Sequence, residues 1–137
     1  MKTLVDSSVI LDTLTGDPVW APWSSAALAR AADEGGLLVN PIVYAEVSVY
    51  IETIEEVDEA LAEFEYCALP REAAFLASKA HRRYRENGGT RSSPLPDLLI
   101  GAHAMVTGCK VLTRDPRRFR TYYPKLEVVA PEPDRDL

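Results

Sequence analysis

The sequence contains little cysteine and no long apolar run. Its two cysteines, Cys67 and Cys109, stand far apart and belong to no CxxC pair or Cys/His cluster, so neither a disulfide framework nor a thiolate zinc site is expected. No apolar stretch approaches the roughly 18 residues that a transmembrane helix requires. The segment MKTLVDSSVILDTL has one lysine and reaches Asp6 early, unlike a secretory signal peptide. We therefore expect a cytoplasmic protein with two free thiols and no membrane segment.

Positive charge is also scarce, except in one segment. The net charge is −6. Residues 1–78 hold three basic and fourteen acidic residues, whereas residues 79–125 hold eleven basic and three acidic ones. The overall acidity argues against a protein that coats nucleic acid nonspecifically. The basic segment predicts either a local track for phosphate groups or a solvated helix face.

Short apolar segments alternate with helix signals along the 137 residues. Such alternation predicts an α/β fold, with a parallel sheet of four to five short strands and helices on both faces. We expect one domain over residues 1–131 and a polar tail over 132–137. The expected strands are 2–5, 37–39, 66–69, 110–112 and 126–129. The expected helices are 7–16, 21–35, one from 41, 54–64, 71–87 and 96–106, with a loop at 90–95.

Four acidic residues stand where this fold would bring them together. Asp6 and Asp115 follow expected strands, and Glu46 and Asp97 lie early in expected helices. Strand carboxyl ends and the loops that follow them line one edge of an open α/β sheet, where sites form. Carboxylates crowded there repel one another, and a divalent cation with oxygen ligands relieves the repulsion. The pattern therefore predicts metal-dependent phosphodiester chemistry.

Each of these acids also has an ordinary structural explanation. Asp6 can cap the next helix, and Asp97 can favour its helix dipole. Asp115 can start the turn into Pro116. A merely solvated role fits Glu46 less well, because its apolar neighbours make an unpaired carboxylate costly. The functional interpretation therefore depends on the four residues together.

The motifs that carry these acids resemble the PIN-domain ribonucleases, and among them the VapC toxins of type II toxin–antitoxin pairs. The resembling segments, which span nearly the whole chain in order, are LVDSSVILD, NPIVYAEV, PLPDLLIGAHA, GCKVLTRDPRRF and YYPKLEVVAPE. The third and fourth segments, joined at this spacing, are the most specific. One departure is Ser8, where the family more often has asparagine.

The resemblance implies a PIN-like three-layer fold and an endoribonuclease that requires Mg²⁺ or Mn²⁺. Its acidic metal site would consist of Asp6, Glu46, Asp97 and Asp115, supported by the hydroxyl groups of Ser7, Ser8 and Thr113. The implied partners are an RNA substrate, with transfer RNA as the family-level expectation, a second copy of the chain, and a cognate VapB-type antitoxin. The aromatic residues that could line an antitoxin groove are Trp20, Trp23, Tyr44 and Tyr50.

Basic residues follow the last acid directly. Arginine binds phosphate with two parallel hydrogen bonds, so Arg114, Arg117 and Arg118 are candidate substrate-binding residues, together with Arg120. A solvated loop is the ordinary alternative. His103 lies six residues after Asp97 in the same expected helix and should point elsewhere, so it is not expected to be a ligand.

Three other classes of protein share some of these sequence features. A haloacid-dehalogenase-like phosphatase requires a second aspartate two residues after the first, where this chain has Ser8. A phospho-receiver domain requires a lysine at the end of a late strand, whereas Lys110 begins its strand. A catalytically inactive PIN-like module, acting only through its antitoxin partner, stays open, although retention of all four acids counts against it.

Overall fold

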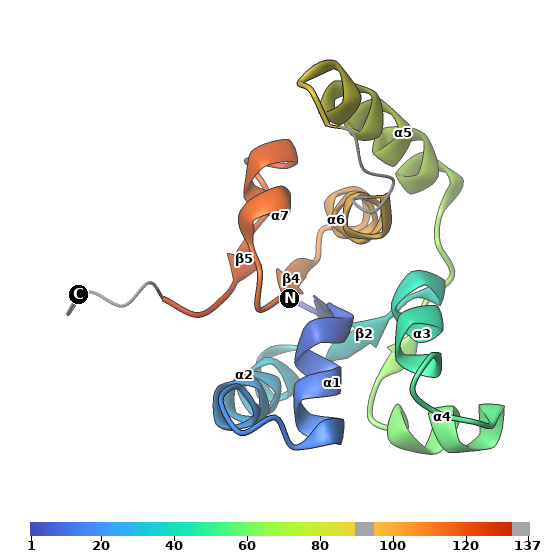
Figure 1. The fold of residues 1–137 in the computed structure, drawn as a ribbon, viewed down its shortest axis with the longest axis vertical. Coiled ribbons are helices and arrows are strands. Elements are labelled where there is room, and N and C mark those ends of the chain that lie inside the picture. The colour runs from blue at the N-terminus through green and yellow to red at the C-terminus, as the bar shows by residue number, and fades with distance from the viewer. Residues whose placement is uncertain (90–94, 133–137) are drawn as a thin grey trace.

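A parallel sheet of five short strands runs through the centre of the molecule (Figure 1). The computed structural model describes residues 1–89 and 95–132. The strands lie in the order β3-β2-β1-β4-β5, and every neighbouring pair is parallel. Their bounds are β1 (Thr3–Val5), β2 (Leu37–Val39), β3 (Glu65–Tyr66), β4 (Lys110–Leu112) and β5 (Val128–Val129). The prediction of a parallel α/β sheet is confirmed.

Helices cover both faces of this sheet. Figure 1 shows α5, α6 and α7 on one side, and α1, α2 and α4 on the other. Helix α3 contacts both α1 and α6, so it links the two helical layers. The helices are α1 (Ser7–Thr15), α2 (Ala21–Glu34), α3 (Pro41–Ser48), α4 (Ile54–Ala60), α5 (Arg71–Glu86), α6 (Leu95–Thr107) and α7 (Arg117–Tyr122). None of the helices described is long and apolar enough to cross a membrane.

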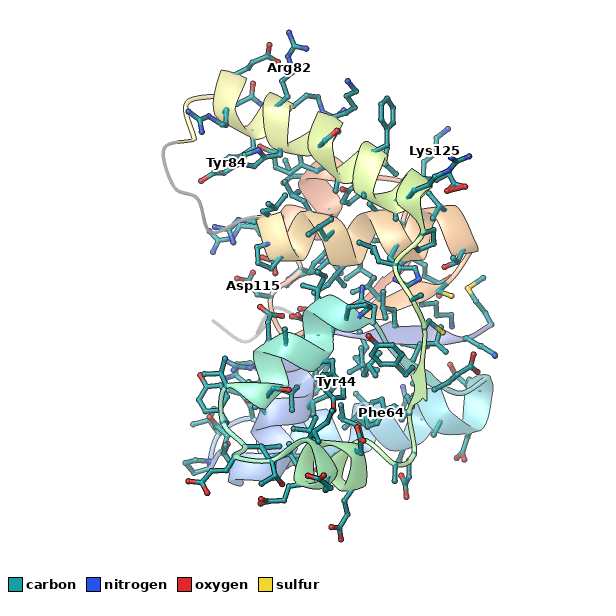
Figure 2. The ribbon with its side chains drawn as sticks, turned by 90° about the vertical axis from the view of Figure 1, so that its right-hand side faces the viewer. Tyr44, Phe64, Arg82, Tyr84, Asp115 and Lys125 are labelled. Carbon is teal, nitrogen blue, oxygen red and sulfur yellow. The ribbon has the colours of Figure 1, made fainter. Side chains whose placement is uncertain are left out.

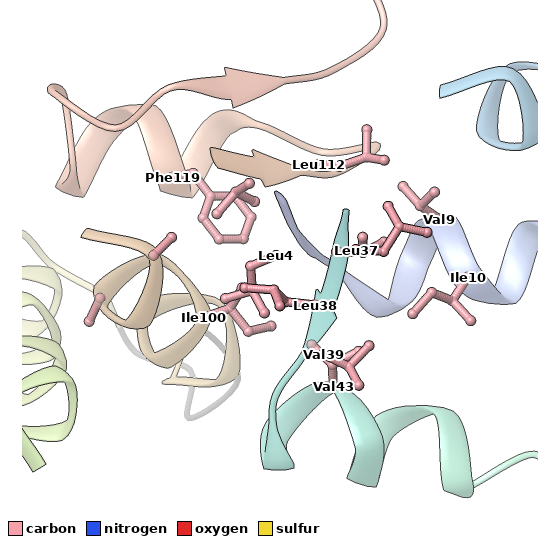
Figure 3. Packing of buried hydrophobic residues seen from close by; sticks show 14 of the residues in the cluster. Leu4, Val9, Ile10, Leu37, Leu38, Val39, Val43, Ile100, Leu112 and Phe119 are labelled. Atoms are coloured by element: carbon pink, nitrogen blue, oxygen red, sulfur yellow. The ribbon is translucent and has the colours of Figure 1, made fainter. Parts of the chain in front are cut away.

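The core consists of strand residues packed between the two helical layers. Figure 3 shows Leu4 beside Ile100 on the α6 side of the sheet, and Leu37 beside Val9 on the α1 side. Each of these side chains is at least 94% buried, since Leu37 is the most exposed at 6%. A two-sided core explains why the strands read as continuous apolar runs. It also fixes where each strand ends, and therefore where the following polar residue lies.

The order of the strands creates a switch point between β1 and β4. The chain proceeds from β1 to β2 and β3 on one side, then returns to add β4 and β5 on the other. The Asp6 amide donates to the Leu112 carbonyl (2.9 Å) just beyond the paired strands. The segments after β1 and β4 therefore begin side by side, in the crevice where open α/β sheets bind their ligands.

Several element boundaries differ from the expectation. Helix α4 ends at Ala60, because the chain must turn through Leu61 and Phe64 to reach β3. Strand β3 begins and ends earlier than expected, β5 is shorter, and α6 begins at Leu95. Helix α7 was not predicted at all. The expected loop at 90–95 lies outside the described residues apart from Leu95, as does most of the expected tail.

Candidate active site

Asp6 is the most buried of the four predicted acids. It follows β1 and occupies the N-cap position of α1, but its carboxylate makes no capping hydrogen bond. Instead, Oδ2 accepts hydrogen bonds from the hydroxyl groups of Thr113 (2.8 Å) and Ser8 (2.9 Å). Only 7% of Asp6 is exposed. A structural cap therefore does not explain this residue.

Thr113 joins the two sides of the switch point. Its side chain is fully buried after β4, and its Oγ1 also accepts from the Asp115 amide (3.1 Å). The Ser8 hydroxyl accepts from the Arg114 amide (3.3 Å). Two hydroxyl groups thus fix the Asp6 carboxylate and the chain after β4 in one network. That Ser8 and Thr113 support catalysis remains a prediction.

Glu46 reaches the same crevice from the second turn of α3. Its Oε1 accepts a hydrogen bond from the Ser7 hydroxyl (3.0 Å), so each of the two serines after Asp6 binds a different acid. Helix α3 starts at Asn40, whose side chain accepts from the Val43 amide (2.9 Å). This cap, followed by Pro41, sets the direction of the helix and brings Glu46 toward β1.

Asp97 lies in the first turn of α6, opposite α7. Its Oδ2 accepts from Arg118 Nη1 at 3.0 Å. The pairing depends on close helix packing: a Cβ at Gly101 would lie 2.5 Å from the Tyr123 ring, and the Tyr123 hydroxyl donates to the Leu98 carbonyl (2.7 Å). The small residues of α6 thus let α7 approach and place an arginine on the acid.

Asp115 is the exposed member of the set. It follows β4 by three residues and precedes α7, and its Oδ1 accepts weakly from the Arg117 amide (3.5 Å). Its charge raises the pKa of the Asp6 carboxyl group. The exposed acid therefore lies within electrostatic reach of the buried one.

Three of the four acids, Asp6, Glu46 and Asp97, have raised pKa values to which neighbouring acids contribute. Burial raises the pKa of Asp6 most, while the Thr113 and Ser8 hydroxyl groups lower it. Burial also raises the pKa of Glu46, and the charges of Asp6 and Asp97 raise it further. The pKa of Asp97 is raised by burial and then by Asp6, although Arg118 opposes both. Neighbouring negative charges thus disfavour full ionisation unless a cation is present.

The chemistry of these donors fits a hard divalent cation, because all four are carboxylates. Their present arrangement is less complete. Within residues 1–89 and 95–132, no three His, Cys, Asp or Glu side chains converge closely enough to hold one ion. Instead, the Arg118 guanidinium forms an ion pair with the Asp97 carboxylate. The roles of the predicted ligands accordingly remain predictions.

Three of the four candidate phosphate-binding arginines, Arg114, Arg117 and Arg118, have different surroundings. Arg114 Nε donates to Asp12 (3.0 Å), and its guanidinium lies 5.4 Å from the centre of the Trp20 ring. Arg118 pairs with Asp97. Arg117 is exposed, and no acidic side chain among the described residues pairs with its guanidinium. Their role in substrate binding remains a prediction, with Arg117 the least engaged of the three.

Sequence reasoning missed two buried polar contacts behind the site. Asp12 is 3% exposed and accepts from Ser24 (2.8 Å) as well as from Arg114. Asn40 Nδ2 lies 3.1 Å from His103 Nδ1, and burial lowers the pKa of His103, so the neutral ring accepts from the amide. His103 therefore links α6 to α3, away from the acids as expected. The available signal for Asp12 was its position three residues after Val9, on the same buried face of α1.

The aromatic residues expected to line one antitoxin groove occupy different surfaces. Trp23 borders a cavity between α2 and β5. Tyr44 borders another cavity between α3, α4 and the edge of the sheet, where its hydroxyl donates to Asp58 (2.7 Å). Trp20 lies under Arg114, and Tyr50 is 67% exposed.

The fold and the acidic crevice define a PIN domain. The profile of the PIN domain family matches residues 3–123, and the chain belongs to this family. The family assignment expected from the acidic motifs is thereby confirmed, and the phosphatase and receiver-domain alternatives lose their basis. No curated protein matches the sequence at a significant level.

Solved structures with this fold include chains from three bacterial complexes. One is VapBC2 from Rickettsia felis bound to a promoter DNA fragment (TM-score 0.73, 16% identity, 96% of this chain and 100% of that chain covered). Another is VapBC-1 from nontypeable Haemophilus influenzae (TM-score 0.72, 16% identity, 95% of this chain and 98% of that chain covered). A third is FitAcB from Neisseria gonorrhoeae (TM-score 0.68, 20% identity, 93% of this chain and 96% of that chain covered). At these identities the likeness establishes the fold.

Proposed function

We propose that the chain is the toxin of a type II toxin–antitoxin pair, a VapC-type endoribonuclease that hydrolyses RNA with Mg²⁺ or Mn²⁺. One observation carries the proposal: Asp6 is buried at the switch point, yet its carboxylate caps no helix and pairs with no cation among the described residues. Instead, it is fixed by Thr113 and Ser8. The charge of Asp115 raises the pKa of Asp6, and the charge of Asp6 raises the pKa of both Glu46 and Asp97. An anionic crevice of this kind favours a divalent cation.

The residues of the chain would divide the work as follows. Asp6, Glu46, Asp97 and Asp115 would hold the ion, with Asp97 released from Arg118. A bound ion supplies a more acidic water as nucleophile and offsets charge on the scissile phosphate. Thr113, Ser8 and Ser7 keep two of the carboxylates oriented. Arg118, once freed from Asp97, and Arg117 would contact phosphate groups of the RNA, and Arg114 would support the loop after β4.

We also propose a cognate VapB-type antitoxin, a homodimer and a cytoplasmic location. Similar folds occur in a toxin–antitoxin complex from Klebsiella pneumoniae and in VapBC-5 from Mycobacterium tuberculosis. An antitoxin is chemically reasonable, because a basic side chain could neutralise the crevice in place of a cation. Arg118 already shows how an arginine satisfies Asp97. Transfer RNA is the substrate to test first.

The decisive experiment measures RNA cleavage by antitoxin-free protein in Mg²⁺, in Mn²⁺ and in a chelator. We expect cleavage only with a divalent ion. Asp6→Asn and Asp97→Asn should abolish it while leaving the fold intact. Asp58→Asn is the matched control, since Asp58 contacts Tyr44 away from the crevice. Metal-independent cleavage, or full activity in both site variants, would refute the proposal.

A catalytically inactive module is the second candidate. The Asp97–Arg118 ion pair and the lack of three converging acids among the described residues favour it. Such a module would bind its antitoxin but cleave no RNA at any metal concentration. A short gene for a small DNA-binding protein directly upstream would support the antitoxin in both cases, so only the cleavage assay separates the two candidates.

A further inference from the structure

A cavity of about 370 Å³ opens beside Asp115, and Asp6 is not among the residues that line it. It is lined by residues from α5, the loop after β4 and α7, namely Tyr84, Asp115, Arg117, Arg118, Thr121 and Tyr122. Its volume falls near the lower end of small-molecule pockets, about 300–1,000 Å³. Figure 2 shows Tyr84 and Asp115 on the same side of the molecule.

We propose that this cavity binds one unpaired nucleotide of the RNA, next to the phosphate that is cleaved. The base would stack on the tyrosine rings, and a flanking phosphate would bind Arg117. The inference deepens the proposed nuclease function and rests on it. It assigns a position for one unpaired nucleotide relative to the acids, and the residues that would hold it.

The two aromatic rings are held in place before any ligand arrives. The centres of Tyr84 and Tyr122 are 6.3 Å apart, with 60° between the ring planes. Tyr84 stacks on His81 (6.3 Å, 15°) and packs against Gly89, where a Cβ would collide with the ring. Such fixed rings suit bases, which stack on aromatic faces regardless of sequence.

Tyr122 is fixed by an arginine of the opposite helix. The Arg83 guanidinium lies 6.0 Å from the centre of its ring and donates to its backbone carbonyl (3.3 Å). The ring is only partly buried, although Tyr123 beside it is 3% exposed and serves the core. Neighbouring tyrosines therefore have separate tasks, and Tyr122 is the one that faces the cavity.

The charges around the cavity suit a nucleotide better than an apolar ligand. Arg117 is exposed, with no acidic partner among the described side chains, and Arg118 joins the cavity to Asp97. Asp115, which also lines the cavity, belongs to the proposed metal site. A nucleotide with its base on the rings would thus place its phosphate between a free arginine and the acids. Paired bases offer no free face for stacking, so the segment must be single-stranded.

The test separates binding from cleavage. Fluorescence anisotropy would measure the affinity of the purified chain for labelled hexauridylate, and for a hexamer of abasic spacers, in a chelator that prevents cleavage. Variants Tyr84→Leu and Tyr122→Leu remove the aromatic face but keep apolar volume, and Tyr84→Phe and Tyr122→Phe restore it. Tyr50→Leu is the control, because Tyr50 is exposed outside this cavity.

We expect each leucine variant to bind hexauridylate roughly tenfold more weakly, and the phenylalanine variants and Tyr50→Leu to bind as the parent does. Affinity for the abasic hexamer should not change. Arg117→Gln should weaken the binding of both ligands. It should also reduce the slope of log affinity against log salt concentration by about 0.7, the value for one phosphate contact on a single strand. Because Arg117 is exposed, this variant still tests the site if a tyrosine variant fails to fold.

Failure of this inference differs from failure of the nuclease function. Unchanged hexauridylate affinity in folded leucine variants that still cleave RNA overturns the cavity assignment and leaves the nuclease intact. Loss of antitoxin affinity with normal RNA affinity also overturns it, since the cavity would then bind protein. If binding depends on the bases but no metal ion gives cleavage, the result supports nucleotide binding in the cavity and refutes the nuclease function.

Discussion

The structure contains two aspartate–arginine pairs of equal length in unlike surroundings. Arg114 meets Asp12, and Arg118 meets Asp97, at N–O distances of 3.0 Å in both cases. The Asp12 side chain is 3% exposed and also binds Ser24. The Asp97 side chain is 30% exposed, and it stands among other acids rather than among neutral donors.

The comparison shows that contact distance alone does not reveal what a pair does. The pair at Asp12 connects α1, α2 and the loop after β4, and the neutral Ser24 hydroxyl donates to the same carboxylate oxygen as Arg114. At Asp97, burial and the charge of Asp6 raise the pKa, and Arg118 only partly offsets them. We infer that the first pair maintains the fold, whereas the second is an exchangeable counter-charge for a site that prefers a metal ion.

The largest effect should come from breaking the buried pair. Asp12→Ala leaves Arg114 and Ser24 without their acceptor, and we expect the free energy of unfolding to fall by about 2–4 kcal/mol. Asp97→Ala should change it by less than about 1 kcal/mol, because the lost pair is partly exposed and a repelled charge leaves with it. Urea denaturation of the metal-free protein measures both. Equal losses would abolish the distinction.

Thr113→Val should have the next largest effect. It keeps the buried shape but removes the hydroxyl that donates to Asp6 and accepts from the Asp115 amide. We expect a loss of about 1.5–3 kcal/mol, typical of a hydrogen bond to a charged group, together with a fall in cleavage rate. Thr113→Ser retains the hydroxyl and should keep most of the activity. If valine and serine behave alike, the hydroxyl does not orient Asp6.

Much of the fold follows from local sequence signals. The apolar runs before Asp6 and Asp115 end where the strands end, and Asn40-Pro41 starts α3 as its capping chemistry requires. These features depend on residues close in sequence. The meeting of the segments after β1 and β4 at one edge of the sheet could also be anticipated, once the strands were taken as parallel.

Contacts between distant segments could not be anticipated in the same way. The pairing of Arg118 with Asp97 requires α7, whose six residues carry four polar side chains and read as a loop. Only Phe119 and Tyr123, four residues apart and buried against α6, reveal the helix. Arg114 was interpreted as a phosphate-binding residue, because its buried partner Asp12 lies 102 positions earlier and the sequence does not reveal their contact. Sequence gives the charges of such residues, but not which charge meets which.

The pH dependence of stability should reveal the crowded acids. The folded-state pKa of Asp6 is raised, so the folded protein binds this proton more tightly than the unfolded chain. Its contribution is present below the unfolded value of 3.8 and is lost as pH rises through the folded pKa. The stability of the parent relative to Asp6→Asn should therefore increase as pH falls from neutral toward that value. Glu65→Gln, at an exposed acid whose pKa Lys2 lowers, should show the opposite trend.

The smallest expected effect is a difference in Mn²⁺ affinity between variants of Arg118 and of Arg114, the arginines of the two pairs. Arg118→Gln frees Asp97, and we expect Mn²⁺ to bind a fewfold more tightly, less than the roughly tenfold that 1.4 kcal/mol represents. Arg117→Gln removes a nearby positive charge without freeing an acid, so it measures the general field effect alone. Arg114→Gln should leave Mn²⁺ affinity unchanged while lowering stability. Calorimetric titration would give the three affinities. Should Arg117→Gln and Arg118→Gln tighten Mn²⁺ binding equally, the Asp97 pair would not compete with metal, and its likeness to the Asp12 pair would be complete.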